Sequence, residues 1–493
     1  MTEGESSTRR RAVRTEEGLF RGATVLLGVA ILTLAASGVA AAVVVNGRDR
    51  YPDQWDPRVI DLVAFVERER GLAFRHPVPI DFLDDAAFRA KVTDTEAPDE
   101  ESQAEIRSAE ALLRAVGLLS GQVDIAAAGN ELAGDGIVGL YDDDDERVLI
   151  RGDVLDDERR STLVHELTHV LQDQSFDLGD HEDGAYKGEE RTSGELAAYT
   201  AVVEADASDV EEAWREALPA AAREALAAAE DKGSAAPDFK GVPPVLIELL
   251  GFPYAFGPDF LQAVVAKDGI AGRNRLFTEP PTTEEQILLP DTYLARQGAQ
   301  EVRTPDLKDG EKAIQDSEDD FGMLSLLVML GERIDFGVAW PAVNGWAGDA
   351  VVAFDRSGTT CVRADVVFDS GAQAERFAGA FATWSSGRPA TQTRNDRSVT
   401  FESCDPGTAA AAGRAAGHVS GIQGLALRKA LIATLQEQGI PPLGAVCTTD
   451  ALLAKLTADR FAMLDGTLTK DPGNKAAQLE IQRSIAQVVP GCR

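Results

Sequence analysis

The stretch "STLVHELTHVLQDQ", residues 161–174, contains a His-Glu-x-x-His motif formed by His165, Glu166 and His169. On an α-helix, residues four apart lie one turn apart on the same face, so both imidazoles can reach one metal ion. Glu166 lies about 100° around the helix from His165, where it can face a metal-bound water. The chain has only five histidines among 493 residues, so a chance occurrence of two of them in this motif would be rare. A surface helix with incidental histidines is the alternative.

The sequence around the motif predicts a helix. No glycine or proline interrupts residues 161–174. The apolar residues that supply faces for burial are Leu163, Val164, Leu167, Val170 and Leu171. We expect Ser161 or Thr162 to cap the start of this helix.

A third metal ligand is needed, because catalytic zinc sites usually have three protein ligands and one water. The alanine-rich stretch "SGELAAYTAVVEADASD", residues 193–209, predicts a second helix. Its Glu204 lies among apolar residues, where a carboxylate needs a partner, and zinc would serve. The sequence therefore predicts a zinc site formed by His165, His169 and Glu204.

At these two motifs, "HELTHVLQDQ" and "VVEADAS", the chain resembles the gluzincin zinc metallopeptidases, whose ligands are two histidines of one helix and a glutamate of the next. More narrowly, it resembles poorly characterised, membrane-anchored bacterial proteins whose second motif usually reads Glu-Gly-Asp-Ala; residues 204–207 here read Glu-Ala-Asp-Ala. The likeness covers most of residues 51–385, through "GIVGLYDDDDERVLIRGD", "FPYAFG", "PPTTEEQILLPDTYL" and "NGWAGDAVVAF". It implies an α+β, zincin-like fold and hydrolysis of peptide bonds through a zinc-bound water, with Glu166 as general base.

One position departs from that pattern. Thermolysin-like gluzincins have a supporting aspartate four residues after the glutamate, where this chain has Ser208. Asp206 is only two residues after Glu204, about 200° around an ideal helix. Either the helix ends there and Asp206 turns inward, or another group orients the histidine ring. A purely structural role for Asp206 at the helix end is the other interpretation.

Other polar residues have weaker patterns. Tyr199 and Tyr254 are candidates for stabilising an oxyanion, although a structural role is typical of such tyrosines. His181 could approach the metal, but its neighbours "GDHEDG" favour a solvated acidic loop. His76 and His418 have no partner pattern.

Residues 136–142 and 147–153 predict a β-hairpin before the motif helix. The acidic run Asp142–Asp145 between them lacks the ligand spacing of a calcium loop, which favours a solvated turn. By the resemblance, the strand before the motif helix is a sheet edge that pairs with an extended peptide substrate.

Residues 24–45, "TVLLGVAILTLAASGVAAAVVV", are uncharged and mainly apolar, and this segment is long enough to span a bilayer as a helix. Arginines precede them, so the positive-inside rule puts the short N-terminus in the cytoplasm. We therefore expect a single-pass cell-membrane protein with an extracytoplasmic catalytic domain; a signal peptide cleaved near Ala40 is the alternative. The expected segments are a cytoplasmic tail (1–23), the anchor (24–45), a zincin-like peptidase domain (51–340), a small α/β module (341–405) and a helical C-terminal region (406–493).

The cysteines fit an exported region. All four follow the anchor: Cys361, Cys404, Cys447 and Cys492. Four cysteines permit three pairings, and we expect sequential disulfides, with Cys361–Cys404 joining two strands. The net charge of −34, from 48 basic and 82 acidic side chains, argues against nucleic acid as a partner.

Two other classes of function fit parts of this sequence. One is a zinc-binding, non-hydrolytic ectodomain that acts as an adhesion, scaffold or sensory module. Retention of Glu166 counts against it, because binding alone needs only the ligands. The other is a structural envelope protein without metal, which requires the histidine pattern to be accidental. The substrate expected from the first interpretation is a peptide or protein, and the sequence does not indicate the oligomeric state.

Overall fold

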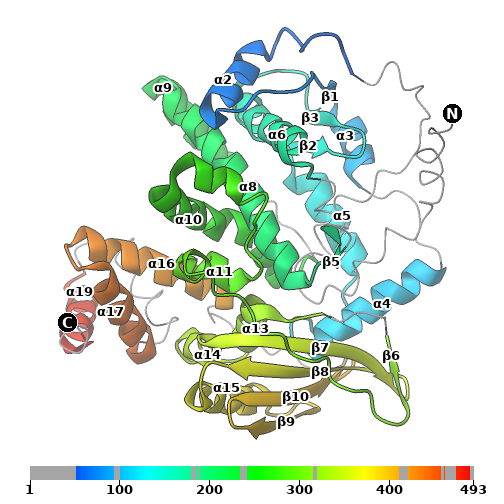
Figure 1. Cartoon of the computed structure of the whole chain (residues 1–493), viewed down its shortest axis with the longest axis vertical. Coiled ribbons are helices and arrows are strands. Elements are labelled where there is room, and N and C mark those ends of the chain that lie inside the picture. The colour runs from blue at the N-terminus through cyan, green and yellow to red at the C-terminus, as the bar shows by residue number, and fades with distance from the viewer. Residues whose placement is uncertain are drawn as a thin grey trace, which may run out of the picture. The chain divides into compact units, whose positions relative to one another are not determined.

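The computed structural model describes residues 51–93, 100–178, 185–186, 189–233, 241–314, 319–409, 420–456, 460 and 474–488. The predicted cytoplasmic tail and anchor lie outside these residues. Among the helices that the structure describes, none is both long and apolar enough to cross a membrane. The described chain combines helices with β-sheets, which confirms the expected α+β class (Figure 1).

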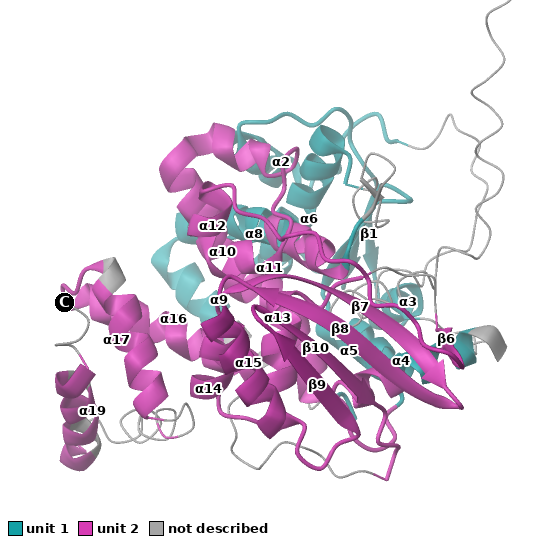
Figure 2. Cartoon of the chain, turned by 60° about the horizontal axis from the view of Figure 1, so that its bottom comes forward, with its two compact units in different colours: residues 1–109, 124–192, 203–242 teal, residues 110–123, 193–202, 243–493 magenta. Residues whose placement is uncertain are grey.

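The chain divides into two compact units (Figure 2). Unit 1 consists of residues 1–109, 124–192 and 203–242, and unit 2 of residues 110–123, 193–202 and 243–493. Two helices, α4 (Glu100–Ala115) and α8 (Ser193–Ala217), have residues in both units. The C-terminal part of α8, from Val203 onward, belongs to unit 1.

Unit 1 holds a three-stranded sheet and the motif helix. The motif helix is α6 (Asp157–Phe176), and the other helices that lie wholly in unit 1 are α2 (Ile60–Arg70), α3 (Asp85–Val92), α5 (Ile125–Gly136) and α9 (Ala220–Gly233). Its strands are β1 (Ile80–Leu83), β2 (Gly139–Asp142), β3 (Arg147–Arg151) and the short pair β4 (Ala185–Tyr186) and β5 (Glu189–Glu190). The sheet order is β1-β3-β2, with β1 parallel and β2 antiparallel to β3. The predicted hairpin is confirmed. The expectation that the strand before the motif helix is a sheet edge is wrong for β3, which directly precedes α6, because β3 pairs with β1 on one side and β2 on the other. The two terminal strands are β1 and β2.

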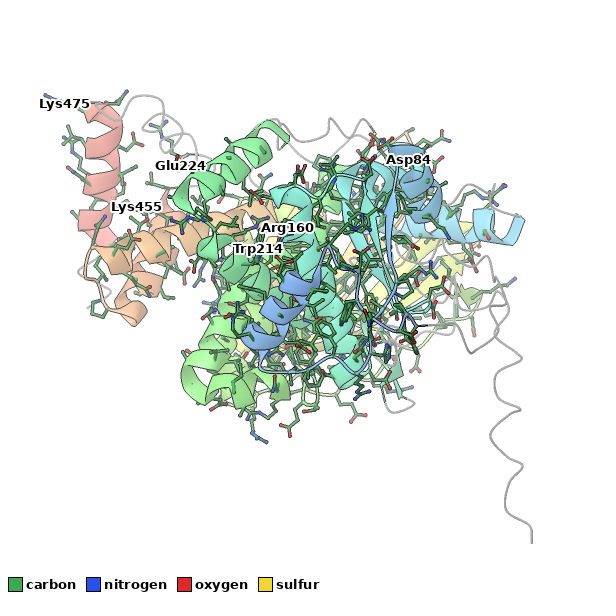
Figure 3. All side chains as sticks on the ribbon, turned by 90° about the horizontal axis from the view of Figure 1, so that it is seen from above. Asp84, Arg160, Trp214, Glu224, Lys455 and Lys475 are labelled. Carbon is green, nitrogen blue, oxygen red and sulfur yellow. A yellow bond between two sulfur atoms is a disulfide. The ribbon has the colours of Figure 1, made fainter. Side chains whose placement is uncertain are left out.

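Helix α6 lies in the core of unit 1. It packs against α2, α9, β2 and β3, and its buried apolar face includes Leu163, Leu167 and Val170, each 0% exposed. Trp214, on α8, belongs to the same hydrophobic core and is 7% exposed (Figure 3). Burial of this apolar face therefore holds the motif helix rigidly, which suits a helix that carries functional side chains.

Unit 2 contains a five-stranded sheet of order β6-β7-β8-β10-β9. Its strands are β6 (Glu311–Ala313), β7 (Trp346–Arg356), β8 (Thr359–Phe368), β9 (Ala390–Asn395) and β10 (Ser398–Cys404). Its helices are α10 (Pro244–Arg275), α11 (Glu284–Leu288), α12 (Pro290–Leu294), α13 (Gly322–Gly331), α14 (Phe336–Val343), α15 (Gly371–Trp384), α16 (Gly421–Glu437), α17 (Pro442–Lys455) and α19 (Lys475–Val488). All paired strands of this sheet are antiparallel.

The strands and the helix predicted within residues 341–405 are present as β7, β8, α15 and β10. The predicted Cys361–Cys404 disulfide is confirmed, and it joins directly opposed residues of β8 and β10. Cys447 is also disulfide-bonded, whereas Cys492, its expected partner, lies outside the described residues. The predicted helical C-terminal region contains α16, α17 and α19.

Candidate metal centre

The motif helix begins earlier than its sequence suggests. Helix α6 starts at Asp157, and the side chain of Asp156 accepts a hydrogen bond from the Arg159 amide at its N-terminus. The expectation that Ser161 or Thr162 caps the helix is therefore wrong, because acidic residues one turn upstream extend it. Ser161 lies inside the helix instead, where its hydroxyl donates to Glu211 at 2.8 Å.

The three predicted ligands meet within unit 1, two from α6 and one from α8. Glu204 Oε2 lies 3.2 Å from His165 Nε2 and 3.7 Å from His169 Nε2. A tetrahedral zinc ion with bonds of about 2.0–2.1 Å would place its ligand atoms about 3.3–3.4 Å apart. Within the described residues, these three form the one group of acidic, histidine or cysteine side chains close enough together to hold a metal ion. The donor set and its spacing thus fit zinc.

Glu166 lies beside this group but does not join it. It is 7% exposed, and the backbone of Tyr141 on β2 hydrogen-bonds its carboxylate. Burial raises the pKa of Glu166 to about 7, and the carboxylates of Glu204 and Glu211 add to this effect. A carboxyl group with a pKa near neutrality is suited to accept and return a proton.

A glycine on β2 allows this strand to approach the motif helix closely. A Cβ atom at Gly139 would lie 2.5 Å from Thr162 Cγ2 and 3.1 Å from Glu166 Oε1. Both distances are shorter than van der Waals contact, so a side chain at this position would require Thr162, Glu166 or β2 itself to shift. Gly139 therefore sets the distance between the sheet edge and the Glu166 carboxylate.

Two further residues contact the far nitrogens of the histidines, and the sequence analysis missed both. Glu211 Oε2 lies 3.2 Å from His165 Nδ1, and Gln172 Oε1 lies 2.8 Å from His169 Nδ1. Glu211 follows Glu204 by seven residues, two turns along α8, and Gln172 follows His169 by three residues. Those spacings place each pair on one helix face, and they are the signal that would have found both residues.

Asp206 forms hydrogen bonds with Arg70 and Gln172 in the structure. Helix α8 continues to Ala217, so the alternatives in which the helix ends at Asp206 are wrong. Asp206 is 0% exposed; its Oδ2 accepts hydrogen bonds from Arg70 Nε at 2.9 Å and from Gln172 Nε2 at 2.8 Å. It therefore supports the residue that contacts His169, as in the alternative where another group orients the ring.

The two histidines differ electrostatically in the metal-free structure. Burial disfavours the charge on His165, but the contacts with Glu204 and Glu211 outweigh it and raise its pKa. Burial lowers the pKa of His169, which faces the neutral Gln172 amide. The two carboxylates thus favour the protonated ring of His165, whereas burial favours a neutral ring at His169.

Of the other histidines, only His76 lies within the described residues, and it is not part of the ligand group. His76 Nε2 lies 3.7 Å from Glu146, and its ring stacks against Tyr51 with centroids 3.7 Å apart. His181 and His418 lie outside the described residues.

The acidic run and the two tyrosines take the following positions. Residues 142–145 form the turn between β2 and β3, where Asp142 accepts a hydrogen bond from the Asp145 amide at 2.9 Å. Tyr199 is 0% exposed and Tyr254 is 49% exposed, and both belong to unit 2. The structural role favoured for Tyr199 agrees with its complete burial.

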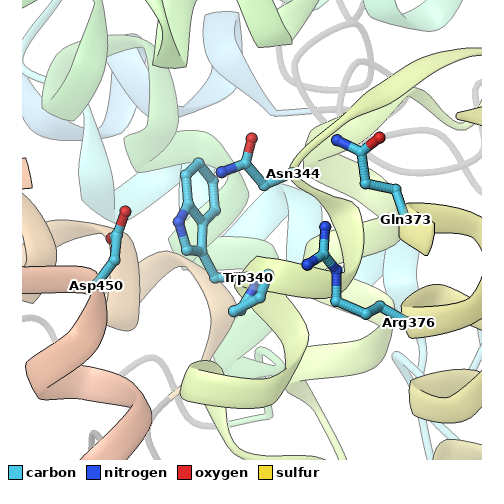
Figure 4. A pocket seen from close by; sticks show the side chains of 6 residues that line it. Trp340, Asn344, Gln373, Arg376 and Asp450 are labelled. Atoms are coloured by element: carbon cyan, nitrogen blue, oxygen red, sulfur yellow. The ribbon is translucent and has the colours of Figure 1, made fainter. Parts of the chain in front are cut away.

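Unit 2 has a small cavity of its own, of about 250 Å³ (Figure 4). Its lining residues are Trp340, Pro341, Asn344, Gln373, Arg376 and Asp450. None of them belongs to the motifs, and the lining offers only one carboxylate. This cavity therefore does not provide a set of metal ligands.

Part of unit 2 matches a known family. Residues 311–423, from β6 to the start of α16, match the model of a Domain of unknown function (DUF8575). No curated protein and no solved structure is similar enough to this chain to count as a match. The matched residues include the five-stranded sheet but none of the ligand group, so the metal centre depends on its own geometry.

Proposed function

We propose that this protein is a zinc-dependent peptidase with a zincin-like unit 1. The observation that supports this most directly is the meeting of His165, His169 and Glu204 beside a buried Glu166. Nitrogen and carboxylate ligands in this number are typical of catalytic zinc, which keeps a fourth position open. A purely structural zinc site would not need Glu166.

In this mechanism, zinc supplies a Lewis-acidic centre that lowers the pKa of water and polarises a carbonyl group. Glu166 accepts a proton from the attacking water and passes it to the departing amine. The Tyr141 backbone and the close approach at Gly139 hold the Glu166 carboxylate in place for both transfers.

An extended peptide is the proposed substrate. Strand β2 pairs with β3 on one side and is one of the two terminal strands of the sheet. A terminal strand has main-chain groups that can pair with another extended chain. Because Gly139 of β2 lies against Glu166, a peptide on this strand would place its carbonyl groups near the general base.

We further propose that residues 24–45 anchor the protein in the cell membrane, with the peptidase outside the cytoplasm. The Cys361–Cys404 disulfide supports an oxidising compartment. The arginines before the apolar stretch support this orientation.

The experiment compares zinc content and peptidase activity in purified full-length variants. His165→Ala, His169→Ala and Glu204→Ala should each lose most of the bound zinc, because each removes a ligand. His76→Ala is the control and should bind zinc like the parent. Equal zinc content in Glu204→Ala would remove Glu204 from the site.

Glu166→Gln separates binding from chemistry. It should retain zinc and lose activity on a peptide library by about 10²–10⁴-fold, because the general base is absent. Equal cleavage by the parent and by zinc-loaded Glu166→Gln would disprove the assigned mechanism. Zinc binding without cleavage by either protein would instead favour the non-hydrolytic ectodomain.

A further inference from the structure

The side chain of Gln172 is almost completely buried between α6 and α8, at 1% exposure. Its Nε2 atom lies 3.0 Å from the Val203 carbonyl oxygen and 2.8 Å from Asp206 Oδ2. Both neighbours are hydrogen-bond acceptors, so the amide must direct its NH₂ group toward them. Arg70 Nε also donates to Asp206 Oδ2, at 2.9 Å, which holds this carboxylate in place.

This orientation leaves Gln172 Oε1 facing His169 Nδ1 at 2.8 Å. A carbonyl oxygen can only accept, so the hydrogen of a neutral His169 ring must lie on Nδ1. The lone pair is then on Nε2, the atom that faces Glu204 at 3.7 Å. Nε2 is also the atom that the proposed site uses to bind metal.

We propose that Gln172 is a positioning residue that fixes the ring tautomer of His169 and so prepares Nε2 for metal binding. This rests on the proposed metal site, with Arg70 and Asp206 acting through Gln172. The two histidines are thus oriented by different groups, a carboxylate for His165 and an amide for His169. Residues that orient a metal-binding histidine typically change metal affinity by 10–100-fold when they are lost.

The first test reads the tautomer directly in the metal-free, full-length protein. Histidine labelled with ¹⁵N gives ring nitrogen shifts that distinguish Nδ1–H from Nε2–H, and the chain has only five histidines to assign. The parent should show Nδ1–H at His169. In Gln172→Met the acceptor is gone, so the hydrogen should move largely to Nε2, where the Glu204 carboxylate can accept it.

One further variant separates this role from packing. Gln174→Met is the matched control: Gln174 is 5% exposed on the same helix, but its amide bonds the Arg75 amide and the His76 carbonyl. It should leave the His169 tautomer unchanged even if it lowers stability.

The second test measures Zn²⁺ affinity by competition with a chromophoric chelator. Gln172→Met should bind Zn²⁺ about 10–100-fold more weakly than the parent, whereas Gln174→Met should match the parent. An unchanged His169 tautomer in folded Gln172→Met would overturn the proposal, as would an unchanged Zn²⁺ affinity. Neither measurement uses catalysis, so a parent without peptidase activity would refute the proposed function and leave this inference standing.

Discussion

Replacing Arg70 with methionine should lower the free energy of unfolding of unit 1 by about 3–5 kcal/mol, the usual cost of breaking a buried ion pair from one side. The Arg70 and Asp206 side chains are both 0% exposed, with Nε and Oδ2 2.9 Å apart. Methionine fills much of the same space without a charge. The cost arises because the Asp206 carboxylate then lies in a buried site that water does not reach.

Two comparisons test this origin of the cost. The double variant Arg70→Met/Asp206→Leu removes both charges and should recover most of the lost stability. Arg160→Met breaks an ion pair of α6 whose partner, Asp61, is 65% exposed, and exposed pairs contribute only about 0–1 kcal/mol. Urea unfolding followed by tryptophan fluorescence measures all of them, with the buried Trp214 reporting on unit 1.

The reasoning fails if the free energy of unfolding of Arg70→Met lies within about 1 kcal/mol of the parent value, because the loss of an exposed ion pair can cost as much. It fails equally if the double variant is as unstable as the single variant. The loss would then come from the shape of the arginine side chain, and not from an uncompensated charge.

Two more predictions concern Gly139 and Glu284. Gly139→Ala should push β2 away from α6, because the added Cβ would lie 2.5 Å from Thr162 Cγ2. This change should reduce the proposed peptidase activity and lower the free energy of unfolding by about 1–3 kcal/mol. Full activity with normal zinc content would contradict the role of this glycine. Burial and the carboxylates of Asp320 and Asp349 raise the pKa of Glu284 well above 4.5. The unfolded state therefore loses this proton first, and stability falls as pH rises from 4.5 through the raised pKa. The free energy of unfolding of Glu284→Gln, measured with urea, should therefore exceed that of the parent by about 1–3 kcal/mol at pH 8 and by little at pH 4.5. An equal increase at both pH values would argue against titration of Glu284.

The meeting of His165, His169 and Glu204 could be predicted from sequence because much of the information is local. His165 and His169 are four residues apart, and Glu204 lies on a helix that its own alanine content favours. Helical periodicity fixes which residues share a face, so the expected ligands meet in the structure. The disulfide between Cys361 and Cys404 was expected only as the sequential one of three possible pairings, and the register of β8 and β10 places the two cysteines opposite each other.

The supports of the site depend on contacts that no periodicity encodes. Arg70 and Asp206 are 136 residues apart in sequence, and nothing near Arg70 marks it as buried. Strand β9 (Ala390–Asn395) was missed because "ATQTRN" has no apolar alternation; it lies at the sheet edge, mostly exposed, and exists through its pairing with β10. Tertiary pairing overrides the local signal in both cases.

The polar contacts around the two histidines form two series of side chains, and each series includes an arginine. His165 contacts Glu211, which pairs with Arg215 at 2.9 Å. His169 contacts Gln172, which Asp206 and then Arg70 support. Each series contains one carboxylate and one guanidinium, so the support around the rings has almost no net charge. In the proposed zinc site, the attraction for a divalent cation would then come mainly from Glu204, because burial raises the pKa of Glu166 to about 7 and so reduces its charge near neutral pH.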